Sequence, residues 1–349
     1  MTVHTLLIHN ASAAKTVQTT AVEALSYSRC VNEIGVCEFV LAANSPAVAY
    51  VGLNNEVVIQ RDGVVDFAGI TRWWEYAESE RRTLTVRAQT AHSLLTRRCV
   101  AWAAATANRS SFSAVAAETI AKTLVNYNAG ASATVVNGRK RAGAITGLTV
   151  QADGATGTAL TLNCEWAPLL ETLQQVAALG GGDFDLVRTA AGAWNFRWYN
   201  GQLGTDRSAT VFFSTELGNM GNPVLTFDHL GEATVAVVGG DGEESARTIA
   251  IRTSADYAAT NDIEAFVNAS GADSTSSAGD AALAERRRQH TFKFDVLQTP
   301  GCNYGTHYGL GDLVTAQYRG TDYGMQVRGV TVTREHYGAE TVDVELVRT

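Results

Sequence analysis

Alternation of apolar and polar side chains with a period of two is the feature that most constrains the fold of this chain. Such alternation sends one set of side chains into a core and the other toward water or a partner, as in a β-strand. Only four prolines occur among 349 residues, whereas 32 glycines are available for turns, so we expect many strands joined by glycine turns. The clearest alternating runs are 83–87, 194–198, 292–296 and 342–346.

Helical patterns are fewer. A first helix is predicted where apolar residues recur every four positions, with Ser111 as its cap and Gly130 just past its end. A second opens near Pro168, which suits a first turn, and is stopped by the glycines at 180–182. The stripe of the first helix is Phe112, Ala116, Ile120 and Leu124.

A third, alanine-rich helix is predicted over about 277–289. The stretch 268–280 is rich in Ser, Gly, Ala and Asp, which predicts a flexible loop. The order of all these patterns predicts a mainly β fold with α+β insertions: two similar small β-barrels plus two peripheral domains carrying a few helices. The predicted parts are a first barrel at 1–90, an α+β domain at 91–212, a second barrel at 213–255 with 291–349, and a small helical insertion at 256–290.

A weak internal repeat supports the paired barrels. Each copy reads as strand, turn, strand with a late Gly-apolar-Thr, and third strand, which describes a meander that can form part of a small barrel. The alternative is that two meanders in one chain resemble each other by chance. Two similar units per chain would let a trimer present six near-equivalent positions. The first copy spans 57–63, 67–71 and 83–86, and the second spans 311–317, 327–331 and 341–344.

Composition bounds the class of protein. Hydrophobic residues make up 46 % and charged residues 18 %, which is typical of a folded chain of two to four domains. The net charge of −8 lacks the basic excess of proteins that grip DNA. No apolar run approaches the roughly 18 residues that cross a bilayer, and the N-terminus carries no secretion signal, so we expect assembly in the cytosol. The five cysteines include no Cys-x-x-Cys pair and are interpreted as reduced, mostly buried thiols.

Motifs that carry chemistry are missing from the sequence. It holds no Gly-x-Ser-x-Gly, His-Glu-x-x-His, Gly-x-x-x-x-Gly-Lys or Gly-x-Gly-x-x-Gly, and no two of its seven histidines stand at helical i, i+4 spacing. Asp183 and Asp185 are the candidate carboxylate pair for glycoside cleavage, although a solvated strand face is the preferred interpretation. We therefore expect no enzyme, no catalytic residue, no cofactor and no metal ion.

Two groups of residues are candidate inter-subunit contacts. Arg286, Arg287 and Arg288 form the one basic run; they suit a helix C-terminus and also an arginine-rich edge that docks on an acidic neighbour. Trp73 and Trp74 are adjacent on a predicted strand and should point to opposite faces, so that one is buried and the other needs cover from this chain or from a partner.

The order of segments resembles the tail hub (baseplate hub) proteins of long-tailed bacteriophages, which are related in fold to the base of type VI secretion spike proteins. The residues that carry the resemblance are generic one by one, and their order is what persuades. They are Gly35–Leu41, Glu56–Gly63, Phe67–Ile70 and Tyr308–Val314.

The resemblance implies a homotrimeric structural ring of the virion tail tip, assembled in the host cytoplasm. Its two tube-type barrels would join the six-fold tail tube or distal tail protein to a three-fold spike or fibre, around the C-terminal end of the tape-measure protein. DNA would pass through the ring during genome ejection without specific binding. Two alternatives remain: a tail module that binds or hydrolyses cell-wall glycan, and a six-fold distal tail ring protein.

Overall fold

The structure is a computed structural model that describes residues 2–10, 15–78, 81–102, 109–269, 275–334 and 340–349. It divides into two compact units, which are described separately. Unit 1 comprises Met1–Met220, Val296–Val347 and Thr349, and unit 2 comprises Gly221–Asp295 with Arg348. The described elements are mostly strands with a few helices, which confirms the mainly β fold expected from the alternation.

An 11-stranded sheet forms the body of unit 1. Every run predicted as a strand lies in a strand of the structure. Along the sheet the strands follow the order β13 (Phe212–Phe213), β19 (Leu313–Tyr318), β20 (Thr321–Arg334), β3 (Ala24–Cys30), β4 (Val36–Ala42), β7 (Arg82–Thr90), β6 (Val64–Glu78), β5 (Glu56–Arg61), β1 (His4–His9) and β2 (Thr16–Thr19), and β21 (Glu340–Arg348) pairs with β20.

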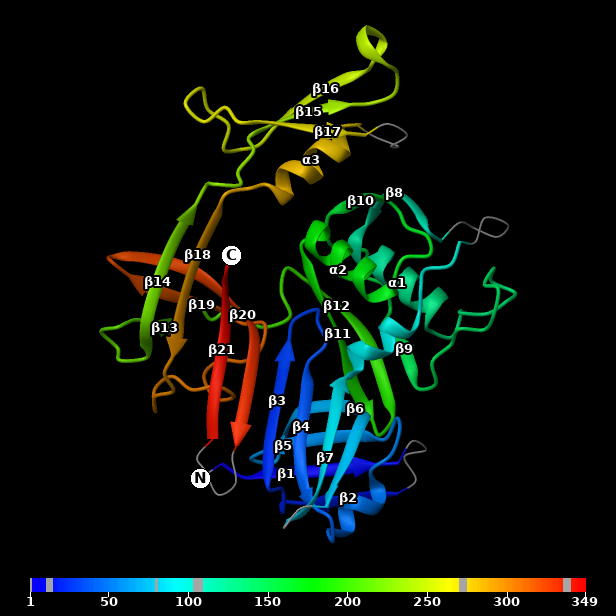
Figure 1. Ribbon diagram of the computed structural model, residues 1–349, viewed down its shortest axis with the longest axis vertical. Coiled ribbons are helices and arrows are strands. Elements are labelled where there is room, and N and C mark those ends of the chain that lie inside the picture. The colour runs from blue at the N-terminus through cyan, green and yellow to red at the C-terminus, as the bar shows by residue number, and fades with distance from the viewer. Residues whose placement is uncertain (1, 11–14, 79–80, 103–108, 270–274, 335–339) are drawn as a thin grey trace. The chain divides into compact units, whose positions relative to one another are not determined.

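The sheet curls strongly on itself. β3 and β6 are separated by β4 and β7, so in a flat sheet they would lie about 14 Å apart. Yet the rings of Tyr27 on β3 and Phe67 on β6 have centroids only 5.9 Å apart, and both side chains are buried. Figure 1 shows β1, β2 and β5 running across the direction of β3, β4 and β7. Among the described strands, no sheet closes into a ring of paired strands.

Charged and phenolic side chains tie distant strands of this curled sheet together. Asp66 accepts hydrogen bonds from the hydroxyls of Tyr27 (2.7 Å) and Tyr304 (2.6 Å). Burial raises the pKa of both tyrosines, so their hydroxyls stay protonated and able to donate. At the start of β21, Glu340 binds Arg61 with an Nη2–Oε1 distance of 2.5 Å and lies 3.0 Å from His4 Nε2. Side chains thus connect β1 and β5 with β21, at opposite ends of the strand order.

The internal repeat corresponds to two meanders, β5–β6–β7 and β19–β20–β21, within this one sheet. Each begins with a hairpin whose two-residue turn has positive φ at both positions: Asp62 (51°) with Gly63 (83°), and Arg319 (53°) with Gly320 (75°). Two such residues form a type I′ turn, whose twist matches that of paired strands. The two copies therefore share turn geometry as well as strand order.

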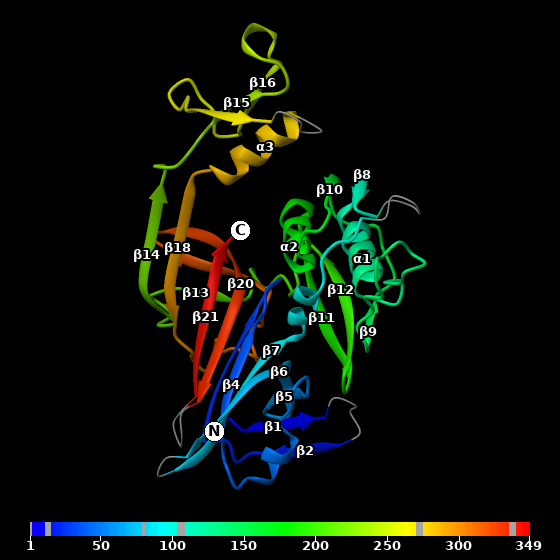
Figure 2. The same ribbon diagram turned by 45° about the vertical axis from the view of Figure 1, so that its right-hand side comes forward.

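A helical layer completes unit 1. Figure 2 shows α1 (Ala117–Asn128) and α2 (Leu169–Gly180) side by side. Both pack on β11 (Gly182–Ala190) and β12 (Ala193–Asn200), which pair with each other. Their apolar faces meet Phe184, Phe196 and Trp198 in one core. The other elements of this layer are η2 (Ala91–Arg97), β8 (Ser111–Ala116), β9 (Leu148–Val150) and β10 (Ala159–Asn163). The short helix η1 (Pro46–Tyr50) instead packs on β1 and β2.

The first predicted helix begins too early. Residues 111–116 form β8, which pairs with β10, so Ser111 does not cap the helix, and Phe112 and Ala116 do not belong to it. Strand pairing with β10 thus decides the structure of 111–116, although the four-residue apolar pattern favours a helix there. The later members of that pattern, Ile120 and Leu124, do lie in the helix and are buried. The second helix matches its prediction, since it starts after Pro168 and ends at Gly180. The residue that follows, Gly181, has a φ of 68°, the left-handed conformation that glycine adopts readily.

Unit 2 is entered along β14 (Met220–Asp228) and left along β18 (Gln289–Val296), which pair with each other. Beyond them, β15 (Val235–Gly239) pairs with both β16 (Ile249–Thr253) and β17 (Glu264–Asn268), and η3 (Glu244–Ala246) precedes β16. Helix α3 (Thr275–Glu285) packs Leu283 against Ala236 and Val238 of β15. The predicted second barrel includes residues 213–255. Of the strands in this range, β13 joins the large sheet, whereas β15 and β16 pair with each other in unit 2.

The third helix differs from its prediction at both ends. It ends at Glu285 rather than near residue 289, because β18 begins at Gln289. It also begins at Thr275, so 275–280 of the expected loop is helical, whereas 270–274 lies outside the described residues. In the part of the chain that the structure describes, no helix has the length and apolar character to cross a membrane. Cys37, Cys164 and Cys302 are buried and all five cysteines are free, as the sequence predicted.

Candidate interaction surfaces

The hairpin of β6 and β7 presents aromatic side chains to solvent. From Arg72 to Glu78 every residue of β6 is exposed, including Trp73 (38 %) and Trp74 (37 %). The prediction that one tryptophan of the pair is buried was therefore wrong. β5 pairs with β6 only as far as Ile70, so from residue 72 onward β6 is paired with β7 alone.

The two faces of this hairpin differ in chemistry. Trp74 lies opposite Val86, and Tyr76 opposite Leu84, so these aromatics continue an apolar face whose β7 members are buried. On the other face the guanidinium of Arg87 stacks 4.5 Å from the centroid of Trp73. Arg87 Nε also donates to Glu38 Oε2 at 2.6 Å. Beside Trp73 the surface is hollowed by a depression of about 580 Å³.

The three arginines lie in unit 2 at the end of α3. Arg286, Arg287 and Arg288 are all exposed, and the Arg286 amide still bonds the carbonyl of Ala282 as in a helix. Arg288 forms an ion pair with Asp256 of the same chain, with an N–O distance of 2.8 Å. The run belongs to unit 2, whereas the tryptophan pair belongs to unit 1.

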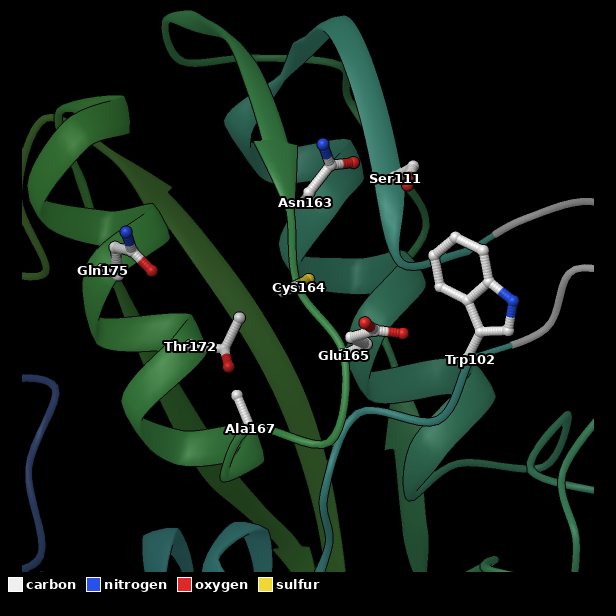
Figure 3. Close-up of a pocket in the computed structure, with 8 residues that line it drawn as sticks. All are labelled: Trp102, Ser111, Asn163, Cys164, Glu165, Ala167, Thr172 and Gln175. Atoms are coloured by element: carbon white, nitrogen blue, oxygen red, sulfur yellow. The ribbon is translucent and has the colours of Figure 1, made fainter. Parts of the chain in front are cut away.

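A groove in the helical layer was not predicted from the sequence. Figure 3 shows Trp102 on one side of it, Gln175 and Thr172 of α2 on the other, and Glu165 between them. The groove measures about 560 Å³, and Trp102 is 39 % exposed. Trp102 lies outside any helix or strand, so no alternation of apolar and polar residues indicates whether its side chain is buried or exposed. The sequence therefore gave no signal for this groove.

The candidate carboxylate pair has no catalytic arrangement. Asp183 is only 3 % exposed, which corrects the expectation of a solvated strand face. Its carboxylate accepts hydrogen bonds from the Asn32 amide (2.8 Å), the Gln326 amide (2.9 Å) and Arg328 (3.1 Å), so it holds β20 to β11. Asp185 points with it to the same strand face and lies 3.6 Å from the buried His92.

Within the described residues, no group of three or more His, Cys, Asp or Glu side chains is placed to hold a metal ion. Exposed features of the described residues include the aromatic hairpin, the arginine run and the groove beside Trp102. The curled β-sheet with its helical layer carries the hairpin and the groove, and unit 2 carries the arginine run.

The chain belongs to the Siphovirus ReqiPepy6 Gp37-like protein family, whose model matches residues 5–346. Membership of this siphovirus family confirms the resemblance to proteins of long-tailed bacteriophages seen in the sequence. No curated protein matches the sequence significantly.

Solved structures share the fold at low sequence identity. Prophage tail protein gp18 from Listeria monocytogenes EGD-e is 10 % identical with a TM-score of 0.61, over 99 % of this chain and 94 % of that one. The 43 kDa tail protein of prophage MuSo2 from Shewanella oneidensis is 12 % identical with a TM-score of 0.59, over 99 % and 98 %. A chain of the Francisella PdpA-VgrG complex is 8 % identical with a TM-score of 0.56, over 100 % and 53 %. The fold is therefore shared with these solved tail proteins and with a chain of that complex.

Proposed function

We propose that this protein is a non-enzymatic hub of the phage tail tip, which assembles as a homotrimeric ring. The ring joins the six-fold tail tube or distal tail protein above to a three-fold spike or fibre below. It surrounds the C-terminal end of the tape-measure protein and lines part of the channel for DNA. The family, its place among tail proteins and the fold support this proposal.

The observation that carries the proposal is the pair of like meanders in one curled sheet. Each starts with the same two-residue turn and continues into an unusually long strand, 15 residues in β6 and 14 in β20. Three chains with two such modules each provide six similar positions around an axis. We keep the division into two tube-type barrels as part of the proposal, with the first built from 1–90 and the second mainly from 291–349.

The β6–β7 hairpin is our candidate for the contact between subunits. An exposed edge strand is a pairing hazard unless something covers it, and soluble proteins usually blunt such edges with charge or proline. Here residues 72–78 carry three charged residues, but they also carry Trp73, Trp74 and Tyr76. Tryptophan, tyrosine and arginine are the residues that most often dominate binding energy at interfaces. A neighbouring subunit that covered this edge would remove the hazard and use these side chains.

The experiment that tests the hub is a count of copies in the assembled tail tip. Cryo-electron microscopy of purified particles should show three copies of this chain in a ring at the end of the tube. Six copies would instead indicate a distal tail ring protein. Molar-mass measurement of the purified protein, alone and with tail components, gives the second arm: a strict monomer that ignores tail proteins would overturn the proposal.

A second candidate function has one specific observation in its favour, the groove beside Trp102. A partly exposed tryptophan flanked by carboxylate and amide groups is suited to stack on and hydrogen-bond a sugar, so the groove favours binding of cell-wall glycan. The test is sedimentation with purified peptidoglycan. Trp102→Ala should abolish binding, whereas Tyr257→Ala, which changes an exposed aromatic of unit 2, should not. Equal retention of both variants would exclude the groove as the glycan site.

A further inference from the structure

Two histidines that are 61 positions apart in the sequence meet in unit 2. His229 directly follows β14, and His290 is the second residue of β18. Their Nε2 atoms are 3.2 Å apart, and the ring planes are inclined at 62°. Sequence spacing excluded a helical i, i+4 pair but said nothing about a pair formed across two strands.

Neighbouring groups hold both rings in place. His229 Nδ1 lies 2.8 Å from Glu232 Oε2, and the side chain of this glutamate is only 1 % exposed. The ring of Phe227 packs edge-on against His290 at a centroid distance of 4.8 Å. Two cations act on His290: Arg288, which forms an ion pair with Asp256, and Arg348. His229 keeps about half of its side chain exposed, so the pair is open to ions from solvent.

This geometry matches that of two nitrogen ligands on one metal ion. Zn²⁺ binds imidazole nitrogen at about 2.0–2.1 Å with tetrahedral angles, which separates two such nitrogens by about 3.3 Å. A histidine ligand usually donates its other N–H to a carboxylate, and Glu232 is positioned to accept from His229 Nδ1. We propose that His229 and His290 form a two-histidine chelate for Zn²⁺, oriented by Glu232, with water in the remaining positions.

Without metal, an N–H of one imidazole fills the gap between the two Nε2 atoms. Zn²⁺ takes the place of that hydrogen once both rings are neutral and protonated on Nδ1, and no covalent or redox step is required. The chelate has two protein ligands, consistent with the lack of any larger ligand group in the described residues.

The place of the chelate gives it a structural role. The chain enters unit 2 along β14 and leaves along β18, and the two histidines lie at the far end of this ribbon. A bound ion would join the two strands where they reach the β15–β16–β17 sheet. It would therefore stiffen the base of unit 2 without contributing to catalysis.

The test is titration of the purified full-length protein with ZnCl₂, followed by calorimetry. One saturable site per chain is expected, with loss of that site in His229→Ala and in His290→Ala. Glu232→Gln should retain the site but weaken it by about 10-fold, because it removes only the partner that orients His229. His307→Ala, which changes a partly buried histidine of unit 1, should bind as the unchanged protein does.

A second measurement needs no variant. Cobalt(II) added to the unchanged protein should give the visible absorption of a nitrogen-ligated ion, and Zn²⁺ should displace it. Absence of saturable Zn²⁺ binding to the unchanged protein, or binding that persists in the His229→Ala/His290→Ala double variant, would overturn the proposal.

Discussion

The two meanders of the large sheet have the same strand order but differ in how completely they are covered. In β20, residues 329–334 pair with β3 and every one of them is buried or half-buried. In β6, residues 72–78 pair with β7 alone and every one of them is exposed. β20 pairs with three strands and β6 with two.

This difference teaches that topology alone does not decide what a meander does. Both copies have the same turn and a long strand. The second half of this strand is covered by β3 in β20, whereas in β6 it is an exposed edge. Because the free edge carries three exposed aromatic side chains besides its charged residues, we interpret it as a docking edge. The sequence of the repeat does not reveal this, since coverage depends on β3, which lies outside both copies.

Loss of the aromatic edge should have the largest effect. Trp73→Ala combined with Trp74→Ala should raise the dissociation constant of the proposed trimer by at least ~100-fold, since buried interface tryptophans each contribute about 2 kcal/mol or more. Light scattering of the purified protein would show the fall in molar mass. Trp166→Ala is the matched control, because Trp166 is also exposed (57 %) but lies in the helical layer. Unchanged mass in the double variant would mean that this edge is not the interface.

Removal of the ion pair between the meanders should come next. Glu340→Ala leaves the guanidinium of Arg61 and the buried ring of His4 without their anionic partner, and we expect the free energy of unfolding to fall by about 3 kcal/mol. Urea denaturation measures the change. Glu78→Ala removes an exposed ion pair with Arg82 and should change stability by no more than about 0.5 kcal/mol. Equal effects would show that Glu340 does not tie the two meanders together.

The same carboxylate should make stability depend on acid pH. Burial raises the pKa of Glu340, but the bonds from His4 and Arg61 outweigh it and lower this pKa from 4.5 to about 2. A lowered pKa means stabilisation that is complete above pH 4.5 and is lost as pH falls toward 2. The stability difference between the unchanged protein and Glu340→Gln should therefore shrink over this range. A difference that stays constant would contradict the assignment.

The smallest expected effect tests the likeness of the two turns. Gly63→Ala and Gly320→Ala each force a β-carbon onto a residue with positive φ, and each should cost about 1 kcal/mol of stability. No atom lies within 4 Å of either new β-carbon, so only the backbone contributes. Gly301→Ala, at an open position without positive φ, should be neutral. Clearly unequal costs at Gly63 and Gly320 would break the equivalence of the two hairpins.

Much of the fold follows from local pattern. Alternation located every strand that was singled out, and Pro168 and Gly181 bounded the second helix, because these signals depend on backbone geometry within a few residues. The first helix was extended too far because β8 pairs with β10, whose residues follow more than 40 positions later. Pairing of β15 with both β16 and β17 is likewise a choice between partners that sequence periodicity cannot rank.

The candidate surfaces were harder to predict for the same reason. Adjacent tryptophans were expected at an interface, but the expectation that one is buried assumed a strand covered on one face throughout. The pairing of β5 with β6 stops at Ile70 of β6. Asp183 looked like a solvated strand position, yet Asn32, Gln326 and Arg328 converge on it from distant parts of the chain. The pair of His229 and His290 could not be predicted from the sequence, because it depends on the pairing of β14 with β18.

The way in which the chain leaves and re-enters the large unit has a last consequence. The Leu297 amide donates to the Asn219 carbonyl at 3.0 Å, so the two points that flank unit 2 are already neighbours. A short turn can bridge them. Unit 2 therefore sits in the chain as an exchangeable cassette, which evolution can enlarge, swap or delete while the strands that build the rest of the molecule keep their connections.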